Sequence, residues 1–159
     1  MQVFDASSII YAWDNYPLQQ FPGLWGWING RIDDSTIMMS SVALAEVQVN
    51  APDCWQWLRD ADLQIHEISN PILHEALRIK DLLGIVGDKY GAGVGENDIL
   101  IIATASILGK ELVTDEAWQP NLPQDPLKYK IPAVCSLQDV RVPWIDFLKY
   151  IKRSEAVFG

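Results

Sequence analysis

The sequence predicts an α/β domain built on a central, mostly parallel sheet of four to five strands. Short apolar runs of β character alternate along the chain with stretches of helical periodicity, as when helices connect parallel strands. The chain has 159 residues, 49% of them hydrophobic, which suffices for one core at the usual length of one domain. We therefore expect a single domain spanning residues 1–159.

The first half of the chain supplies three of the expected strands. Ser7 and Ser8 can cap the first helix, and Pro22 fits the first turn of the second. Ser41 is expected to cap the helix after the second strand. The expected strands are Gln2–Phe4, Thr36–Ser40 and Leu63–Glu67, and the expected helices are Ile9–Trp13, Gly23–Arg31, Val42–Val49 and one that begins at Pro52.

The second half contains the longest helices and two further strands. Asn70-Pro71 is a helix start, and Gly109 is a C-terminal cap. The segment 84–95 carries five glycines and is expected to be a flexible loop rather than a phosphate-binding fingerprint. The expected elements are helices Asn70–Leu83 and Asn97–Leu108, strand Glu111–Thr114, a Pro-rich loop over 115–132, strand Ala133–Cys135 and a last helix from Pro143 to Arg153.

Four carboxylates stand where these elements begin or end. Asp5 and Asp115 follow the first and fourth strands, Glu46 lies in an otherwise apolar helix, and Asp98 opens another helix. The functional crevice of an open α/β sheet lies at the carboxyl ends of its strands. A carboxylate beside a buried element is costly unless its charge is compensated. We therefore expect the four acids to converge, with Glu46 nearly buried, and to bind a hard cation such as Mg²⁺ or Mn²⁺.

Each acid also has a structural interpretation when taken alone. Asp5 can cap the first helix, Asp98 can complement a helix dipole, and Asp115 can start a turn. A zinc site is excluded because Cys54 and Cys135 are far apart and no close Cys or His ligand pairs exist. The two cysteines are expected to be reduced and partly buried.

The charge of the chain argues against a generic nucleic-acid binder. The net charge is −9 and the isoelectric point is near 4.5, whereas such proteins usually carry a basic footprint. Basic residues gather in the last fifth of the chain. No secretory signal is visible, and the longest apolar run, Ile99–Ala103, is too short to cross a bilayer. We expect a soluble, cytoplasmic protein.

Three segments resemble the motifs of PIN-domain nucleases. The four acids occur in the order of that family, and the likeness covers most of the chain. Phe4–Ile10 is similar to the opening strand–Asp motif, Ser41–Glu46 to the second motif, and Gly95–Ala105 with Gly109 and Leu112–Asp115 to the third and fourth motifs of VapC-like toxins. Phe4–Trp13, with Trp25 and Trp27 after it, also resembles an uncharacterised PIN-like subgroup.

The resemblance implies a three-layer α/β/α fold and a metal-dependent endoribonuclease that cleaves RNA. It implies that Asp5, Glu46, Asp98 and Asp115 are catalytic and bind one or two Mg²⁺ or Mn²⁺ ions. Ser7 would support the site and Thr114 would hold the fourth acid, with Glu96 and Glu116 as further candidates beside the metal. Members of this family are often toxins held inactive by an antitoxin protein, and often homodimers.

The sequence departs from the family pattern at two places, and two other functions are also compatible with it. Ala6 stands where the family usually has a hydroxyl residue, and Glu116-Ala117-Trp118 replaces a basic residue near the fourth acid. The alternatives are a non-catalytic PIN-like binding module and an aspartyl phosphatase-like phosphoryl-transfer enzyme. The second alternative requires another Asp two residues after Asp5, and Ser7 occupies that position.

Overall fold

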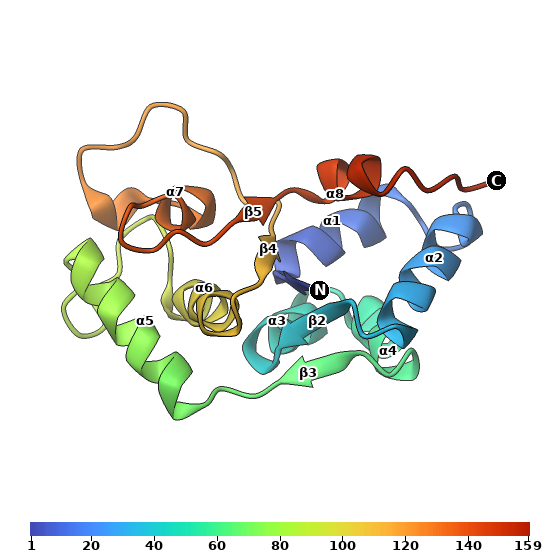
Figure 1. Cartoon of the computed structure of the whole chain (residues 1–159), viewed down its shortest axis with the longest axis horizontal. Coiled ribbons are helices and arrows are strands. Elements are labelled where there is room, and N and C mark those ends of the chain that lie inside the picture. Colours follow the sequence, from blue (N-terminus) through green and yellow to red (C-terminus); the bar gives the residue numbers. More distant parts are fainter.

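The computed structural model describes residues 1–159, and all five of its strands lie in one parallel sheet. The strands are β1 (Gln2–Phe4), β2 (Ile37–Ser40), β3 (Gln64–His66), β4 (Glu111–Val113) and β5 (Trp144–Ile145), in the spatial order β3-β2-β1-β4-β5. Helices flank the sheet, so the predicted α/β class with a parallel sheet is confirmed (Figure 1).

Helices connect every pair of consecutive strands, and the direction of the connections reverses at β1. The chain moves from β1 to β2 and β3 on one side, then crosses back to β4 and β5. The helices are α1 (Ala6–Asn15), α2 (Pro22–Asp33), α3 (Ser41–Asn50), α4 (Pro52–Asp60), α5 (Asn70–Leu83), α6 (Glu96–Leu108), α7 (Ile131–Cys135) and α8 (Phe147–Ser154), with a 3₁₀ turn at Pro126–Lys128. The boundary between β1 and β4 is therefore the switch point, where open α/β sheets place their ligands.

The fifth strand is not where the sequence analysis placed it. Ala133–Cys135, expected as a strand, lies in α7, and the strand is Trp144–Ile145. Every residue of α7 is buried, and a short apolar run does not distinguish a buried strand from a buried helix. Pro132 in the first turn favours the helix.

Three expected helix starts also move. α1 begins at Ala6 with Asp5 at its N-cap position, so Ser7 and Ser8 lie inside the helix instead of capping it. Ser40, not Ser41, is the N-cap of α3, where its hydroxyl accepts a hydrogen bond from the Ala43 N–H. The last helix begins at Phe147 rather than Pro143, because β5 intervenes and Asp146 caps α8 by accepting from the Lys149 N–H.

The glycine-rich segment is fixed by close backbone contact. The Gly93 and Val94 N–H groups donate to the carbonyls of Leu127 and Tyr129, both at 2.8 Å. A Cβ placed on Gly91 would lie 2.6 Å from the Leu127 carbonyl oxygen. The glycines thus allow this segment to pack against 126–129, immediately before α6.

One contiguous core lies between the sheet and the helices. Phe4 packs edge-on against Phe147 and Tyr150, which joins β1 to α8. Cys54 and Cys135 are both buried free thiols, and burial raises the pKa of each to about 12. None of the helices combines the length and apolarity needed to cross a bilayer.

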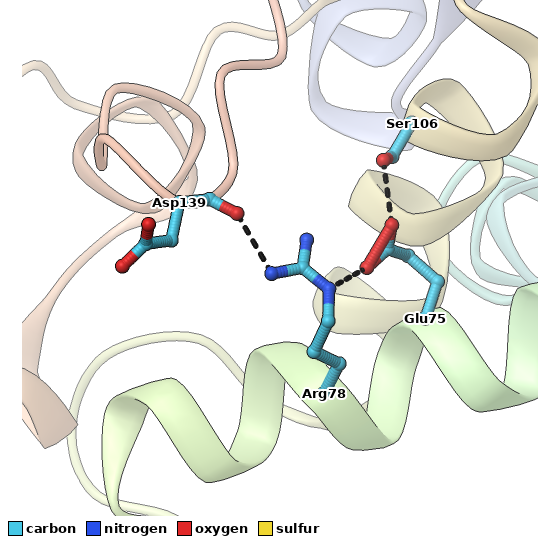
Figure 2. Close-up of polar contacts among 4 residues, drawn as sticks. All are labelled: Glu75, Arg78, Ser106 and Asp139. Atoms are coloured by element: carbon cyan, nitrogen blue, oxygen red, sulfur yellow. Dashed lines mark hydrogen bonds and ion pairs between the residues drawn. The ribbon is translucent and has the colours of Figure 1, made fainter.

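A polar cluster ties the pair α5 and α6 to the segment that precedes β5. Figure 2 shows Arg78 of α5 between Glu75 and the backbone carbonyl of Asp139. Arg78 donates to Glu75 Oε1 and to that carbonyl, the latter at 2.8 Å, and Ser106 of α6 donates to Glu75 Oε2 at 2.9 Å. Burial acts to raise the pKa of Glu75, but the hydrogen bonds from Arg78 and Ser106 outweigh it and lower the pKa below its ordinary value.

We expect Glu75→Gln to lower the free energy of unfolding at pH 7 by about 1 kcal/mol, because the variant keeps the shape but loses the charge-assisted hydrogen bond to a half-exposed Arg78. The folded-state pKa of Glu75 is depressed, so its contribution exists above the unfolded pKa and is lost as the pH falls through the folded value. Urea unfolding between pH 7 and pH 3 measures this. Glu67→Gln removes an exposed carboxylate and is the control; equal effects of both variants contradict the assignment.

Candidate metal-binding site

The centre of the candidate site is Asp5, a buried carboxylate at the end of β1. The side chain is only 2% exposed. Its Oδ2 accepts hydrogen bonds from the Ser7 hydroxyl at 2.6 Å and from the Thr114 hydroxyl at 2.8 Å. Since Ser7 lies in α1 and Thr114 directly follows β4, these two bonds hold Asp5 at the switch point between β1 and β4.

The same two hydroxyls organise the backbone after β4. Ser7 Oγ accepts from the Asp115 N–H at 2.9 Å, and Thr114 Oγ1 accepts from the Glu116 N–H at 3.2 Å. Thr114 was expected to hold the fourth acid, and its contacts are the Asp5 carboxylate and the Glu116 backbone. Each hydroxyl therefore donates its O–H to Asp5 and accepts one backbone N–H from the turn.

Asp98 is held at the amino end of α6. Its Oδ2 accepts from the Gly95 N–H at 3.0 Å, which satisfies the N-cap backbone as half of a capping box does. Because α6 leads into the amino end of β4, its own amino end lies at the carboxyl edge of the sheet. The topology therefore brings Asp98 to the same edge as Asp5.

Glu46 extends toward these acids from α3, the helix that follows β2. Glu46 is half-buried rather than nearly buried as expected. Burial raises the pKa of Glu46, a hydrogen bond from Asn97 opposes this, and the charges of Asp5, Asp98 and Glu116 raise it further. A shallow pocket of about 320 Å³ joins Glu46 to the start of α6, and Glu96 also lines it.

Asp115 and Glu116 are adjacent and half-buried after β4, but they have different neighbours. Asp115 Oδ1 accepts from the Phe147 N–H at 2.8 Å and so binds the first residue of α8. Burial raises the pKa of Asp115 to about 6; the Phe147 N–H opposes this, and the charges of Asp146 and Asp5 add to it. Burial also raises the pKa of Glu116, and the charges of Asp5 and Asp98 raise it further, with Lys130 as the opposing cation.

The arrangement thus gathers four mutually repelling carboxylates: Asp5, Glu46, Asp98 and Glu116. Sequence reasoning placed Glu116 beside the site and Asp115 in it. Asp115 is linked to this group through the charge of Asp5.

The chemistry of this cluster fits a hard divalent cation. Its side chains offer only carboxylate oxygens, and among them Lys130 is the only basic side chain that affects their pKa values. No three Asp, Glu, His or Cys side chains, as they stand, are placed to hold an ion together. Asp5 is fixed by its hydroxyl partners, whereas Glu46 and Glu116 are longer, half-buried side chains. Cation binding therefore requires rotation of these glutamates toward Asp5.

A second cavity of about 590 Å³ adjoins the acids on the β5 side. Trp118 and Trp144 stack there with ring centroids 5.6 Å apart, and Trp118 is 51% exposed. Tyr11, Asp146 and Lys149 also line this cavity. Sequence reasoning missed the pair because its members are 26 positions apart and belong to a loop and a strand that only the fold brings together.

The comparisons with known proteins agree with this fold. A family model described as a domain of unknown function, DUF4411, matches residues 2–158. No curated protein matches the chain.

The fold resembles solved structures of PIN-domain toxins of the VapC and FitB type. A chain of DNA-bound VapBC from Salmonella typhimurium aligns with a TM-score of 0.56 and 17% identity, over 92% of this chain and 97% of that chain. A chain of FitAcB from Neisseria gonorrhoeae gives 0.54 and 15%, over 93% and 99%. A chain of VapBC2 from Rickettsia felis, bound to a promoter DNA fragment, gives 0.51 and 19%, over 81% and 96%.

We expect Asp5→Asn to raise the melting temperature by a few degrees at pH 7 in metal-free buffer. Burial raises the pKa of Asp5, the hydrogen bonds from Ser7 and Thr114 oppose this, and the charge of Asp98 raises it further. A carboxyl whose folded-state pKa is raised destabilises the fold as the pH rises through that value, so the gain should shrink toward acid pH. Thermal unfolding from pH 4 to pH 8 measures it, with Asp53→Asn on the exposed start of α4 as the control. A loss of stability at pH 7 would show that burial does not dominate at Asp5.

Proposed function

Since the chain belongs to the DUF4411 family and has the PIN-domain fold, we propose that it is a Mg²⁺- or Mn²⁺-dependent endoribonuclease acting as one domain over residues 1–159. The observation that carries the proposal is the convergence of Asp5, Glu46, Asp98 and Glu116 at the switch point of the sheet. Like charges gathered at a half-buried site favour a cation, and carboxylate oxygens favour magnesium or manganese.

We assign the acids according to their contacts. Asp5, Glu46 and Asp98 hold the cation, as the sequence predicts, and Glu116 joins them because the charges of Asp5 and Asp98 raise its pKa. Asp115 stays a candidate ligand, with one oxygen on the Phe147 N–H. Ser7 and Thr114 orient Asp5, as residues behind a metal ligand commonly do. The bound cation would supply an activated water and offset the charge of the phosphodiester.

The cavity of Trp118 and Trp144 gives the proposed substrate a place beside the acids. Aromatic faces stack on unpaired bases without regard to sequence. Lys149 lies at the rim and can pair with a phosphate, and a bound cation offsets part of the negative charge of the site. Single-stranded RNA fits this combination, because a duplex cannot present unstacked bases.

We also propose an antitoxin partner and a homodimer. The neighbouring structures named above are VapBC and FitAcB assemblies, and α5 exposes apolar side chains. Leu73, Leu77 and Leu82 of that helix are between 40% and 55% exposed. Light scattering of the purified chain tests the dimer, since a mass near 17.9 kDa would contradict it.

The metal assignment is tested by titrating Mn²⁺ into the protein and its variants, followed by cleavage of a fluorescent single-stranded RNA. We expect Asp5→Asn, Glu46→Gln, Asp98→Asn and Glu116→Gln each to weaken Mn²⁺ binding more than about tenfold and to abolish cleavage. Asp115→Asn should act mainly on stability and raise the melting temperature at pH 7, because burial outweighs the hydrogen bond from the Phe147 N–H and raises the pKa of Asp115 to about 6.

The outcomes separate the alternatives. Undiminished cleavage by Asp5→Asn would reject the nuclease. Metal binding without cleavage of any RNA would favour the non-catalytic module. If Asp115→Asn costs as much Mn²⁺ affinity as Glu116→Gln, Asp115 is also a ligand.

We expect Trp118→Ala to raise the KM for single-stranded RNA roughly tenfold, because a lost base stack costs about 1–3 kcal/mol, with little change in Mn²⁺ affinity. Steady-state cleavage kinetics measure the effect. Leu148→Ala removes an apolar but non-aromatic side chain from the same cavity and is the matched control. Equal effects of the two variants would mean that stacking does not hold the substrate.

A further inference from the structure

A third cavity, of about 500 Å³, lies at the amino ends of the parallel strands, whereas the acids lie at their carboxyl ends. Its floor is formed by Gln2 and Glu111, which begin β1 and β4 and are paired in register. Its walls come from α2, through Trp27 and Arg31, and from α8, through Tyr150 and Arg153. The rings of Trp27 and Tyr150 pack against each other in the wall of the cavity, with ring centroids 5.6 Å apart.

Polar atoms without partners are concentrated here. Four buried side-chain polar atoms of the protein lack a hydrogen-bond partner, and three of them belong to residues of this cavity. They are Gln2 Oε1, Arg31 Nε and the Tyr150 hydroxyl. The Arg31 guanidinium lies close enough to the Tyr150 oxygen to oppose the burial that raises the pKa of Tyr150, so the groups left to donate are the Arg31 Nε–H and the Tyr150 O–H. Tyr150 is only 3% exposed. Leaving such groups unpaired is unfavourable, and their concentration in one cavity indicates a ligand that pairs with them.

The cavity also holds one uncompensated positive charge. Both oxygens of Glu111 accept from Arg153, at 2.9 and 2.5 Å, and Gln2 Nε2 donates to Glu111 at 3.5 Å. Glu111 and Arg153 therefore neutralise each other. Arg31 forms none of the three ion pairs of the protein, and its guanidinium lies over Trp27 at 5.6 Å.

The three partnerless atoms differ in what they require from a ligand. Arg31 Nε can only donate, the Tyr150 hydroxyl can donate, and Gln2 Oε1 can only accept. A carboxylate offers acceptor oxygens alone. A phosphate monoester offers acceptor oxygens and, in its monoprotonated form near pH 6, a P–OH donor, because its second pKa is about 6. Inorganic phosphate keeps at least one P–OH at this pH.

We propose that this cavity, formed by Gln2, Trp27, Arg31, Glu111, Tyr150 and Arg153, binds the phosphate group of a small molecule. Arg31 and Tyr150 donate to its oxygens, and Gln2 Oε1 accepts from its P–OH. The site lies at the opposite ends of the strands from Asp5, Glu46, Asp98 and Glu116. Phosphate binding there does not depend on the proposed nuclease activity. Its ligand is either inorganic phosphate or a phosphate monoester, and the cavity has room for the latter.

Calorimetric titration at pH 6 in buffer without divalent cations tests the proposal, with inorganic phosphate, adenosine monophosphate and acetate as separate probes at matched ionic strength. We expect phosphate or the monoester to bind and acetate to bind at least tenfold more weakly. Preference for the monoester identifies an organic phosphate as the ligand, and preference for inorganic phosphate identifies the free ion.

Two variants separate a binding role from a structural one. Tyr150→Phe removes a single hydroxyl, and Arg31→Met removes the charge; each should reduce phosphate affinity at least tenfold. Arg59→Met is the matched control, because the Arg59 guanidinium lies over Trp55 at 5.9 Å on α4, away from this cavity.

The proposal is overturned if phosphate, its monoester and acetate bind equally weakly, or if Tyr150→Phe and Arg59→Met change phosphate affinity to the same extent. Should Arg31→Met fail to fold, the comparison of Tyr150→Phe with the unmodified chain decides the question, because that variant loses no charge and no packing volume beyond one oxygen.

Discussion

The burial of Asp5 is the constraint on which the site depends. A carboxylate that is 2% exposed between two parallel strands requires donors, and Ser7 and Thr114 provide them. The same hydroxyls bind the backbone of Asp115 and Glu116. Ser7 and Thr114 therefore fix both the carboxylate of Asp5 and the backbone of the two acids that follow β4. These hydrogen bonds also join β1 to β4 at the point where the connections of the sheet reverse.

The carboxyl ends and the amino ends of the parallel strands carry opposite electrostatic character. At the carboxyl ends, burial and the charges of neighbouring carboxylates raise the pKa values of Asp5, Glu46 and Glu116, with Lys130 as the opposing cation at Glu116. At the amino ends, the pair of Glu111 and Arg153 leaves the charge of Arg31 uncompensated. A chain with a net charge of −9 can therefore present one site for a cation and one for an anion, because local pairing and not the total charge decides which ion each site favours.

Much of the fold could be predicted from patterns of single elements. The first four strands and the helices up to α6 follow from apolar periodicity, from prolines at helix starts and from Gly109, which adopts the left-handed conformation at the end of α6. The prediction failed in the last third. The run Ile131–Cys135 is apolar throughout, so its period carries no information, and Trp144–Ile145 is too short to show alternation. Pairing with β4, not sequence preference, makes that dipeptide a strand.

By itself, the sequence determined that acids would stand at the ends of β1 and β4, in the second turn of α3 and in the first turn of α6, because the alternation of strand and helix fixes which ends meet. Only the tertiary structure decided how the two acids after β4 differ in their hydrogen-bond partners. Asp115 and Glu116 are adjacent and chemically alike, and their difference arises from the Phe147 N–H, which α8 presents to Asp115 alone. Likewise, Gln2, Arg31 and Tyr150 are unremarkable polar residues in sequence. They form one cavity because β1, α2 and α8, distant along the chain, pack together at the amino edge of the sheet.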